Sequence, residues 1–157
     1  MMRAVLTIGL PGCGKSTYAA TQPGLVELNL DALREVVAGD ATNQHATPRA
    51  VGLRHRLMNH HAAQRDDLIV SDTNVRRSHR RRLIRALHRL GYRVELVFFN
   101  VGLTTCLRRN AGRDRVVPAE AIAQMAALIQ AHPPRVDEAD GYMELADPDD
   151  PLIPPAG

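Results

Sequence analysis

The residues with the clearest chemical signature lie near the N-terminus, where glycines surround a lysine. Gly9–Ser16 satisfies the pattern G-x-x-x-x-G-K-[ST]. In such a loop, backbone N–H groups turn inward around phosphate oxygens, and the following helix adds its positive end. Lys15 is the only lysine among 20 lysines and arginines, so a compact ammonium stands where a slim side chain must reach a phosphate. The predicted nucleotide-binding residues are Gly9, Pro11, Gly12, Cys13, Gly14, Lys15, Ser16 and Thr17, with Lys15 catalytic and Ser16 a Mg²⁺ ligand.

Two carboxylates follow short apolar runs further along the chain. Asp72 ends the run that starts at Asp67, where proteins with this loop place an acid that orients Mg²⁺ or its waters; an Asx turn is the alternative. Asp31 begins a predicted helix and precedes Arg34 by three residues, so both side chains share one face. The pair could act as a general base beside an anion-binding guanidinium. The alternative is a plain N-cap aspartate with an intrahelical ion pair.

Arginines supply the remaining candidates. Arg109, Arg113 and Arg115 surround the loop 111–117, which could close over phosphates as a lid and neutralise charge there. A solvated basic loop is the alternative. The predicted helix from Arg77 to Leu90 could follow a nucleic-acid backbone, or present a solvated face; its arginines at the N-terminal end are Arg76, Arg77, Arg80, Arg81 and Arg82.

The elements that must position these residues alternate between strand and helix. Such alternation predicts an α/β fold, in which a mostly parallel sheet has helices on both faces and ligands bind outside the carboxyl ends of the strands. The predicted strands span 4–8, 25–28, 67–72 and 92–99. The predicted helices run from the lysine to about residue 20 and over 31–38, 48–64, 77–90, 103–110 and 118–131.

Composition predicts one domain over 1–132, followed by an acidic, proline-rich tail over 133–157 in which residues 142–145 could form a short strand. Residues 49–115 hold 16 arginines and five acids, a net of +11, whereas 133–157 hold one arginine and seven acids, a net of −6. The basic middle suits a polyanionic partner, or it reflects arginine-rich codon usage. Aromatic residues make up 3%, which argues against a platform of stacked aromatics.

The composition also argues against a membrane protein and against a disulfide-rich secreted protein. No apolar run approaches the roughly 18 residues of a membrane span, so no membrane partner is expected. Two cysteines predict no disulfide framework, and the N-terminus lacks the features of a signal peptide. We therefore expect a cytoplasmic protein.

Four stretches in this order resemble the kinase domain of phage and bacterial polynucleotide 5′-hydroxyl kinases. They are LTIGLPGCGKST at 6–17, NLDALR at 29–34, SDTN at 71–74 and LRRNAGRDRVVP at 107–118. The resemblance implies a P-loop kinase fold and transfer of the ATP γ-phosphate to the 5′-hydroxyl of DNA or RNA, as in nucleic-acid repair.

The resemblance also assigns roles to single residues. Lys15 and Ser16 hold the phosphates of ATP, or of another nucleoside triphosphate, with Mg²⁺. Asp31 is the general base, and Arg34 binds the acceptor's adjacent phosphate. Asp72 supports Arg34 and contacts the metal through water. The remaining implied roles are substrate binding for Asn74, a place near the nucleotide for Arg109, and the catalytic lid arginine for Arg113.

The sequence departs from the family at two places. Ala32 stands where relatives often carry a second acid, and the lid stretch is one residue shorter, so Arg113 and Arg115 could exchange roles. There is no D-x-D-x-[TV] phosphatase motif. Two alternative functions stay open: a small-molecule or nucleoside kinase, and a nucleotide-binding switch, although Thr73 follows Asp72 where a switch would place Gln or Glu.

Overall fold

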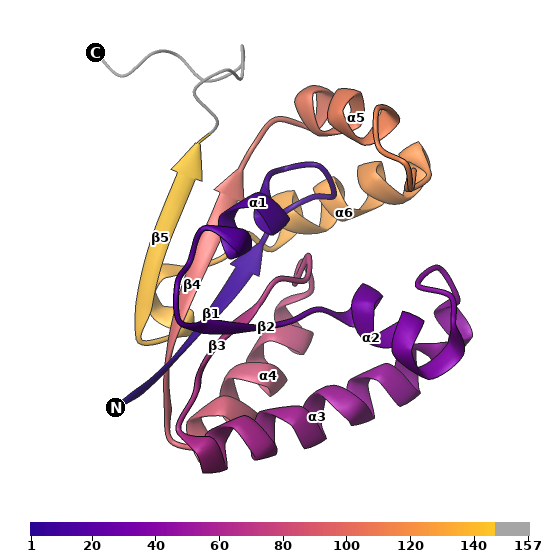
Figure 1. Ribbon diagram of the computed structural model, residues 1–157. Coiled ribbons are helices and arrows are strands. Elements are labelled where there is room, and N and C mark those ends of the chain that lie inside the picture. The colour runs from indigo at the N-terminus through magenta and orange to yellow at the C-terminus, as the bar shows by residue number, and fades with distance from the viewer. Residues whose placement is uncertain (147–157) are drawn as a thin grey trace.

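Short apolar runs rich in Val, Ile and Leu form a five-stranded sheet in the computed structural model, which describes residues 1–146 (Figure 1). All neighbouring strands are parallel, and the order is β2-β3-β1-β4-β5. The parallel α/β fold predicted from the alternating pattern is therefore confirmed. The strands are β1 (Met2–Ile8), β2 (Leu25–Leu28), β3 (Asp67–Val70), β4 (Tyr92–Asn100) and β5 (Gly141–Ala146).

Both faces of the sheet are covered, because successive residues of a strand point to opposite sides. On one face Leu6 and Leu96 pack with Met58 and Leu87 of the helices α3 and α4. On the other face the strands pack against α1, α5 and α6. Figure 1 shows the two groups of helices on opposite sides of the sheet. The helices are α1 (Lys15–Ala20), α2 (Leu30–Ala38), α3 (Thr47–Gln64), α4 (Arg77–Arg89), α5 (Leu103–Ala111) and α6 (Ala119–Ala131).

The start of α2 differs from the sequence-based expectation. We expected Asp31 to be able to cap this helix, but Asn29 is the N-cap, and its side-chain oxygen accepts a hydrogen bond of 3.2 Å from the amide of Ala32. Asp31 consequently lies in the first turn, where its carboxylate is not consumed by capping. A 3₁₀ turn, Gln44–Ala46, lies between α2 and α3, where the sequence predicted no helix.

The segment after residue 132 corrects a second expectation. Residues 133–146 are not a loose tail, because Val136–Glu138 forms a 3₁₀ turn and β5 pairs along β4 at the sheet edge. The physical reason is Arg80 of α4, whose side chain is fully buried and forms two 2.9 Å hydrogen bonds with Glu138. The short predicted strand is therefore present, and the rest of the tail, 147–157, lies outside the described residues.

Arg80 also reaches back toward the sheet. Its Nη1 donates to the carbonyl oxygens of Asn74 at 2.9 Å and Val75 at 3.1 Å. One guanidinium thus joins α4, the loop after β3 and the C-terminal turn. Over residues 1–146, no helix is both long enough and apolar enough to cross a bilayer.

Replacing Arg80 by Met should lower the free energy of unfolding by about 3–5 kcal/mol, because it removes both hydrogen bonds to the buried Glu138 carboxylate and leaves only Arg77, 3.6 Å away, as a cation. Urea denaturation of the full chain measures this loss. The matched control is Arg135→Met, which breaks a largely exposed ion pair with Asp137 and should cost about 0–1 kcal/mol. Equal losses in the two variants would contradict the role of Arg80.

Candidate active site

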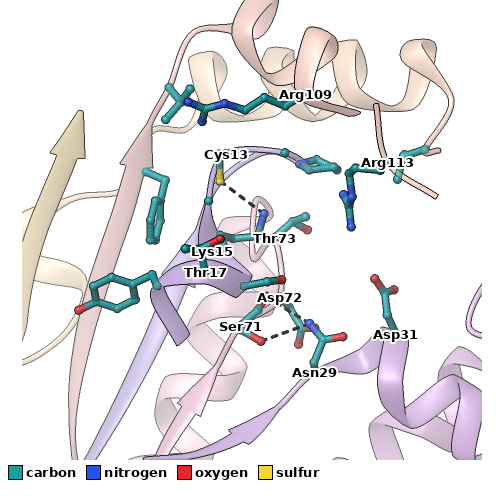
Figure 2. Close-up of a pocket in the computed structure, with 18 of the residues that line it drawn as sticks. Cys13, Lys15, Thr17, Asn29, Asp31, Ser71, Asp72, Thr73, Arg109 and Arg113 are labelled. Carbon is teal, nitrogen blue, oxygen red and sulfur yellow. Dashed lines mark hydrogen bonds between the residues drawn. The ribbon is translucent and has the colours of Figure 1, made fainter. Parts of the chain in front are cut away.

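A cavity of about 1000 Å³ opens at the carboxyl ends of the strands, where the parallel fold predicts a ligand site (Figure 2). Its walls come from the loop between β1 and α1, the start of α2, the loop after β3, and the segment that includes α5 and the predicted lid. Most predicted site residues line it: Pro11, Gly12, Cys13, Gly14, Lys15, Ser16, Thr17, Asp31, Arg34, Asp72, Arg109, Arg113 and Arg115.

Two glycines give the phosphate loop its shape. Gly12 and Gly14 have φ angles of +84° and +103°, which residues with a side chain rarely adopt. A Cβ added at Gly12 would also lie 2.8 Å from the carbonyl oxygen of Cys106 in α5. The loop can therefore pack this closely against α5 only because Gly12 has no side chain.

The Lys15 side chain is buried inside the loop. Its Nζ donates to the carbonyl oxygens of Gly9 at 3.1 Å and Leu10 at 2.7 Å. It also donates to Cys13 Sγ at 3.5 Å, so this thiol contacts the ammonium directly. Gly9 itself does not line the cavity; it contributes the carbonyl that holds Lys15 and an amide that donates to Thr73.

The loop fits a nucleotide phosphate on geometry and charge. It combines left-handed glycines, a cation held within the loop and an exposed Ser16 at the start of α1. Among residues 1–146 no three His, Cys, Asp or Glu side chains gather into a metal cage. The predicted protein ligand is the Ser16 hydroxyl. A site with so few protein ligands suits Mg²⁺, which is commonly held by one or two protein ligands together with substrate phosphates and water.

Asp31 stands across the cavity between two guanidinium groups. It forms a short ion pair with Arg34, three residues further along α2, and its other oxygen lies 3.2 Å from Arg115 of the lid loop. Arg34 is buried and anchored by the carbonyl oxygen of Ala41 at 2.9 Å. Figure 2 shows Asp31 and Arg113 pointing toward one another beside the phosphate loop. The structure thus brings together the predicted acid, its neighbouring arginine and the lid.

Asp72 has other partners than the resemblance implied. We expected it to support Arg34, but Oδ2 accepts a 2.9 Å hydrogen bond from Arg54 of α3 and Oδ1 accepts one of 2.7 Å from the amide of Leu30. Burial raises the pKa of the Asp72 carboxyl, and the Leu30 amide and Arg54 oppose this rise. The expectation was wrong because Arg34 is bound by Asp31, Ala41 and Thr47 instead.

Asn74 is a second correction among the predicted site residues. It does not line the cavity, and its Nδ2 donates to the carbonyl oxygen of Thr7 at 2.8 Å. With a φ of +46°, Asn74 turns the chain after β3, and a side chain that bonds the neighbouring strand stabilises this turn. Its role is to hold the loop that carries Asp72.

One part of the cavity is lined by apolar side chains. The sequence did not predict this part of the site. Residues spread over four separate segments meet there, and no spacing pattern connects them. Arg109 of α5 also lines the cavity (Figure 2), and its place near the nucleotide stays a prediction. The apolar lining consists of Tyr18, Phe99, Val101, Val117, Met125 and Leu145.

Comparison with known proteins places this geometry in a wider group. Residues 5–132 match the AAA_33 family, described as an AAA domain. A chain of the Pnkp1/Rnl/Hen1 RNA repair complex is similar with 20% identity and a TM-score of 0.65, over 83% of this chain and 44% of that one. A kinase-like protein from Chloroflexus aurantiacus matches with 15% identity and a TM-score of 0.71, over 92% and 88% of the two chains. Shikimate kinase from Bacteroides thetaiotaomicron matches with 16% identity and a TM-score of 0.60, over 92% and 87%.

At these identities the solved structures establish the fold, and the P-loop kinase fold expected from the sequence resemblance is confirmed. The chain spans less than half of the matched chain in the RNA repair complex and most of the other two.

Gly12→Ala should weaken ATP binding at least about tenfold and lower the free energy of unfolding by about 1–3 kcal/mol, because a Cβ is strained at this φ and meets Cys106. Nucleotide titration and urea denaturation measure the two effects. Gly24→Ala is the control: its φ is +79° with nothing within 4 Å, so it should cost only about 1 kcal/mol and leave ATP affinity unchanged. Similar ATP affinity in both variants would contradict the close approach at Gly12.

Arg54→Met should lower the free energy of unfolding by about 3 kcal/mol, because it leaves a buried carboxylate unpaired. Adding Asp72→Asn should recover at least about half of this loss, since the amide oxygen can still accept from Leu30.

Losing Arg54 lets burial raise the pKa of Asp72 further. A carboxyl that keeps its proton longer when folded loses stability as the pH rises through that pKa, so the deficit should be larger at about pH 8 than at about pH 5. A deficit independent of pH, with no recovery in the double variant, would contradict the pairing.

Proposed function

This chain belongs to the AAA_33 family of AAA domains, and we propose that it is an ATP-dependent kinase that transfers the γ-phosphate to the 5′-hydroxyl end of DNA or RNA. The proposal includes a role in nucleic-acid repair. It also includes a cytoplasmic location, which agrees with two free cysteines, Cys13 and Cys106.

One observation carries the phosphotransferase proposal. The carboxylate of Asp31 and the phosphate loop with Lys15 line the same cavity from opposite walls. A general base must lie within reach of the proton it takes, while the phosphate cradle must hold the group that moves. A switch protein would need no carboxylate at this place, so the arrangement favours a kinase over a switch.

The proposed reaction is a direct transfer. The hydroxyl oxygen of the acceptor forms a bond to the γ-phosphorus while the bond to the bridging oxygen of the donor breaks, and the hydroxyl proton passes to Asp31. Lys15 and Arg113 stabilise the charge spread over the phosphoryl oxygens. The bound Mg²⁺ would neutralise charge between the β- and γ-phosphates, with Ser16 as a ligand and Asp72 reached through water.

A polynucleotide acceptor is favoured by what surrounds Asp31. Arg34 is buried, fixed by Ala41 and aimed at the same carboxylate, which suits a guanidinium that holds a phosphate next to the reacting hydroxyl. The basic stretch 49–115 and the four motif stretches point to the same acceptor. A small-molecule acceptor is the second candidate, because shikimate kinase matches over 87% of its own length.

Incubation with γ-labelled ATP and Mg²⁺ tests these candidates directly. The acceptors are a 5′-hydroxyl oligonucleotide, a nucleoside, shikimate, and water alone. Label on the oligonucleotide supports the proposal, label on a small molecule supports the second candidate, and free phosphate alone indicates a switch.

Asp31→Asn should lower kcat for phosphate transfer at least about 100-fold, because the amide cannot accept the proton. ATP affinity should change less than about twofold, since the phosphate loop holds the nucleotide without Asp31. Steady-state kinetics and nucleotide titration measure both. Glu35→Gln, an exposed acid-to-amide change on the same helix, is the control and should leave both unchanged. Equal losses of transfer and ATP affinity would assign Asp31 to nucleotide binding.

A further inference from the structure

Two helices on one face of the sheet carry arginines and no acids. Over Thr47–Gln64 and Arg77–Arg89 there are nine arginines and neither Asp nor Glu. Both helices pack on the same core cluster, and Figure 1 shows them on the same side of the sheet. An acid-free surface of this kind attracts polyanions, and it is not explained by the folding of the chain.

The structure separates the structural arginines from the rest. Arg54 and Arg80 are buried in ion pairs with Asp72 and Glu138, and Arg77 contacts Glu138 at 3.6 Å. These three therefore do not belong to a docking surface, although the sequence grouped Arg77 and Arg80 with their neighbours. On these two helices and at the residue before α4, seven exposed arginines have no ion pair within residues 1–146: Arg49, Arg56, Arg76, Arg81, Arg82, Arg85 and Arg89.

Of these seven, Arg76 stands directly before α4, next in sequence to the loop that lines the cavity, and Arg82 lies in the first half of α4. Arg76 follows the loop whose Asp72 and Thr73 line the cavity. Arg76, His79 and Arg82 recur every third residue at the start of α4, and residues three apart on a helix are neighbours on its surface. Burial and the charges of Arg82, Arg76 and Arg54 lower the pKa of His79, in keeping with a basic surface there. Because α4 begins directly after the loop that carries Asp72 and Thr73, the cluster of Arg76, His79 and Arg82 starts close to the cavity along the chain.

The composition of this surface limits its partner. Neither helix carries an aromatic residue other than histidine, and none of the exposed large apolar side chains lies on either one. A membrane surface or a protein partner would be expected to meet apolar anchors. Guanidinium groups without stacking side chains fit a phosphate backbone that is held by charge alone, whatever its base sequence.

We propose that Arg76, His79 and Arg82, hereafter the α4 basic surface, bind the phosphate backbone of the acceptor strand beyond its reacting 5′ end. This inference rests on the proposed function and extends it. A long acceptor therefore gains affinity from phosphates that lie outside the cavity, on the α4 basic surface. A mononucleotide does not reach this surface and gains nothing from it.

Arg76→Gln/Arg82→Gln is the test variant, and Arg81→Gln/Arg89→Gln is the control with the same loss of charge on the same helix. Transfer to an oligonucleotide of about 12 nucleotides is compared with transfer to a nucleoside 3′-monophosphate. Fluorescence anisotropy measures binding of the same labelled oligonucleotide at several salt concentrations, independently of catalysis.

The test variant should raise KM and Kd for the oligonucleotide at least about tenfold, and should lower the slope of log K against log salt by about 1.4, or 0.7 per single-strand phosphate. KM for ATP and for the mononucleotide should stay within about twofold, because neither extends past the cavity. The control variant should weaken oligonucleotide binding less than about threefold.

Three outcomes would overturn the inference: equal weakening in both variants, unchanged binding in the test variant, or a mononucleotide KM that rises as much as the oligonucleotide KM. Failure of the proposed function is a different result, in which the unaltered protein labels no nucleic-acid acceptor. The anisotropy measurement still decides in that case, because selective loss of binding in the test variant supports the surface, and absence of oligonucleotide binding to the unaltered protein refutes it.

Discussion

The arrangement of the site depends on two hydrogen bonds that the carboxylate of Asp72 accepts inside the fold. One oxygen accepts from the amide of Leu30 and so fixes the first turn of α2; the other accepts from Arg54 and so fixes α3. Asp31 occupies that first turn, so the position of the proposed base is set by an acid from the loop after β3. A buried charge is tolerated only when it is fully paired, and here the pairing itself orders three segments around the cavity.

The loop that carries Asp72 is in turn held from two sides. Toward the sheet, Asn74 donates to Thr7 and the Thr73 carbonyl accepts from Gly9, which ties this loop to the phosphate loop. Away from the sheet, Arg80 bonds the carbonyl oxygens of Asn74 and Val75. A site that must hold its groups to within fractions of an ångström gains from such a rigid supporting shell.

The sequence was sufficient for the parts that depend on local patterns. The spacing of glycines and Lys15 predicted the phosphate loop, and apolar runs such as Leu25–Leu28 predicted strands, because these signals lie within a few residues. Contacts between distant residues were not predictable. Arg54 with Asp72 and Arg80 with Glu138 join residues 18 and 58 positions apart. Among so many arginines no pattern marks which one will be buried, and the Asp72 partner was accordingly misassigned to Arg34.

The ion pair between Arg80 and Glu138 also has a consequence for a chain that is still being synthesised. Every motif residue of the site, from Gly9 to Arg115, precedes Glu138, as does the cation that Glu138 neutralises. Until translation reaches the 3₁₀ turn and β5, Arg80 has no carboxylate partner, so burying its guanidinium would cost free energy. In the same period the outer edge of β4 is not yet paired with β5. The phosphate loop and the strands beside it can therefore assemble early, but the five-stranded sheet is complete only after β5 has been synthesised.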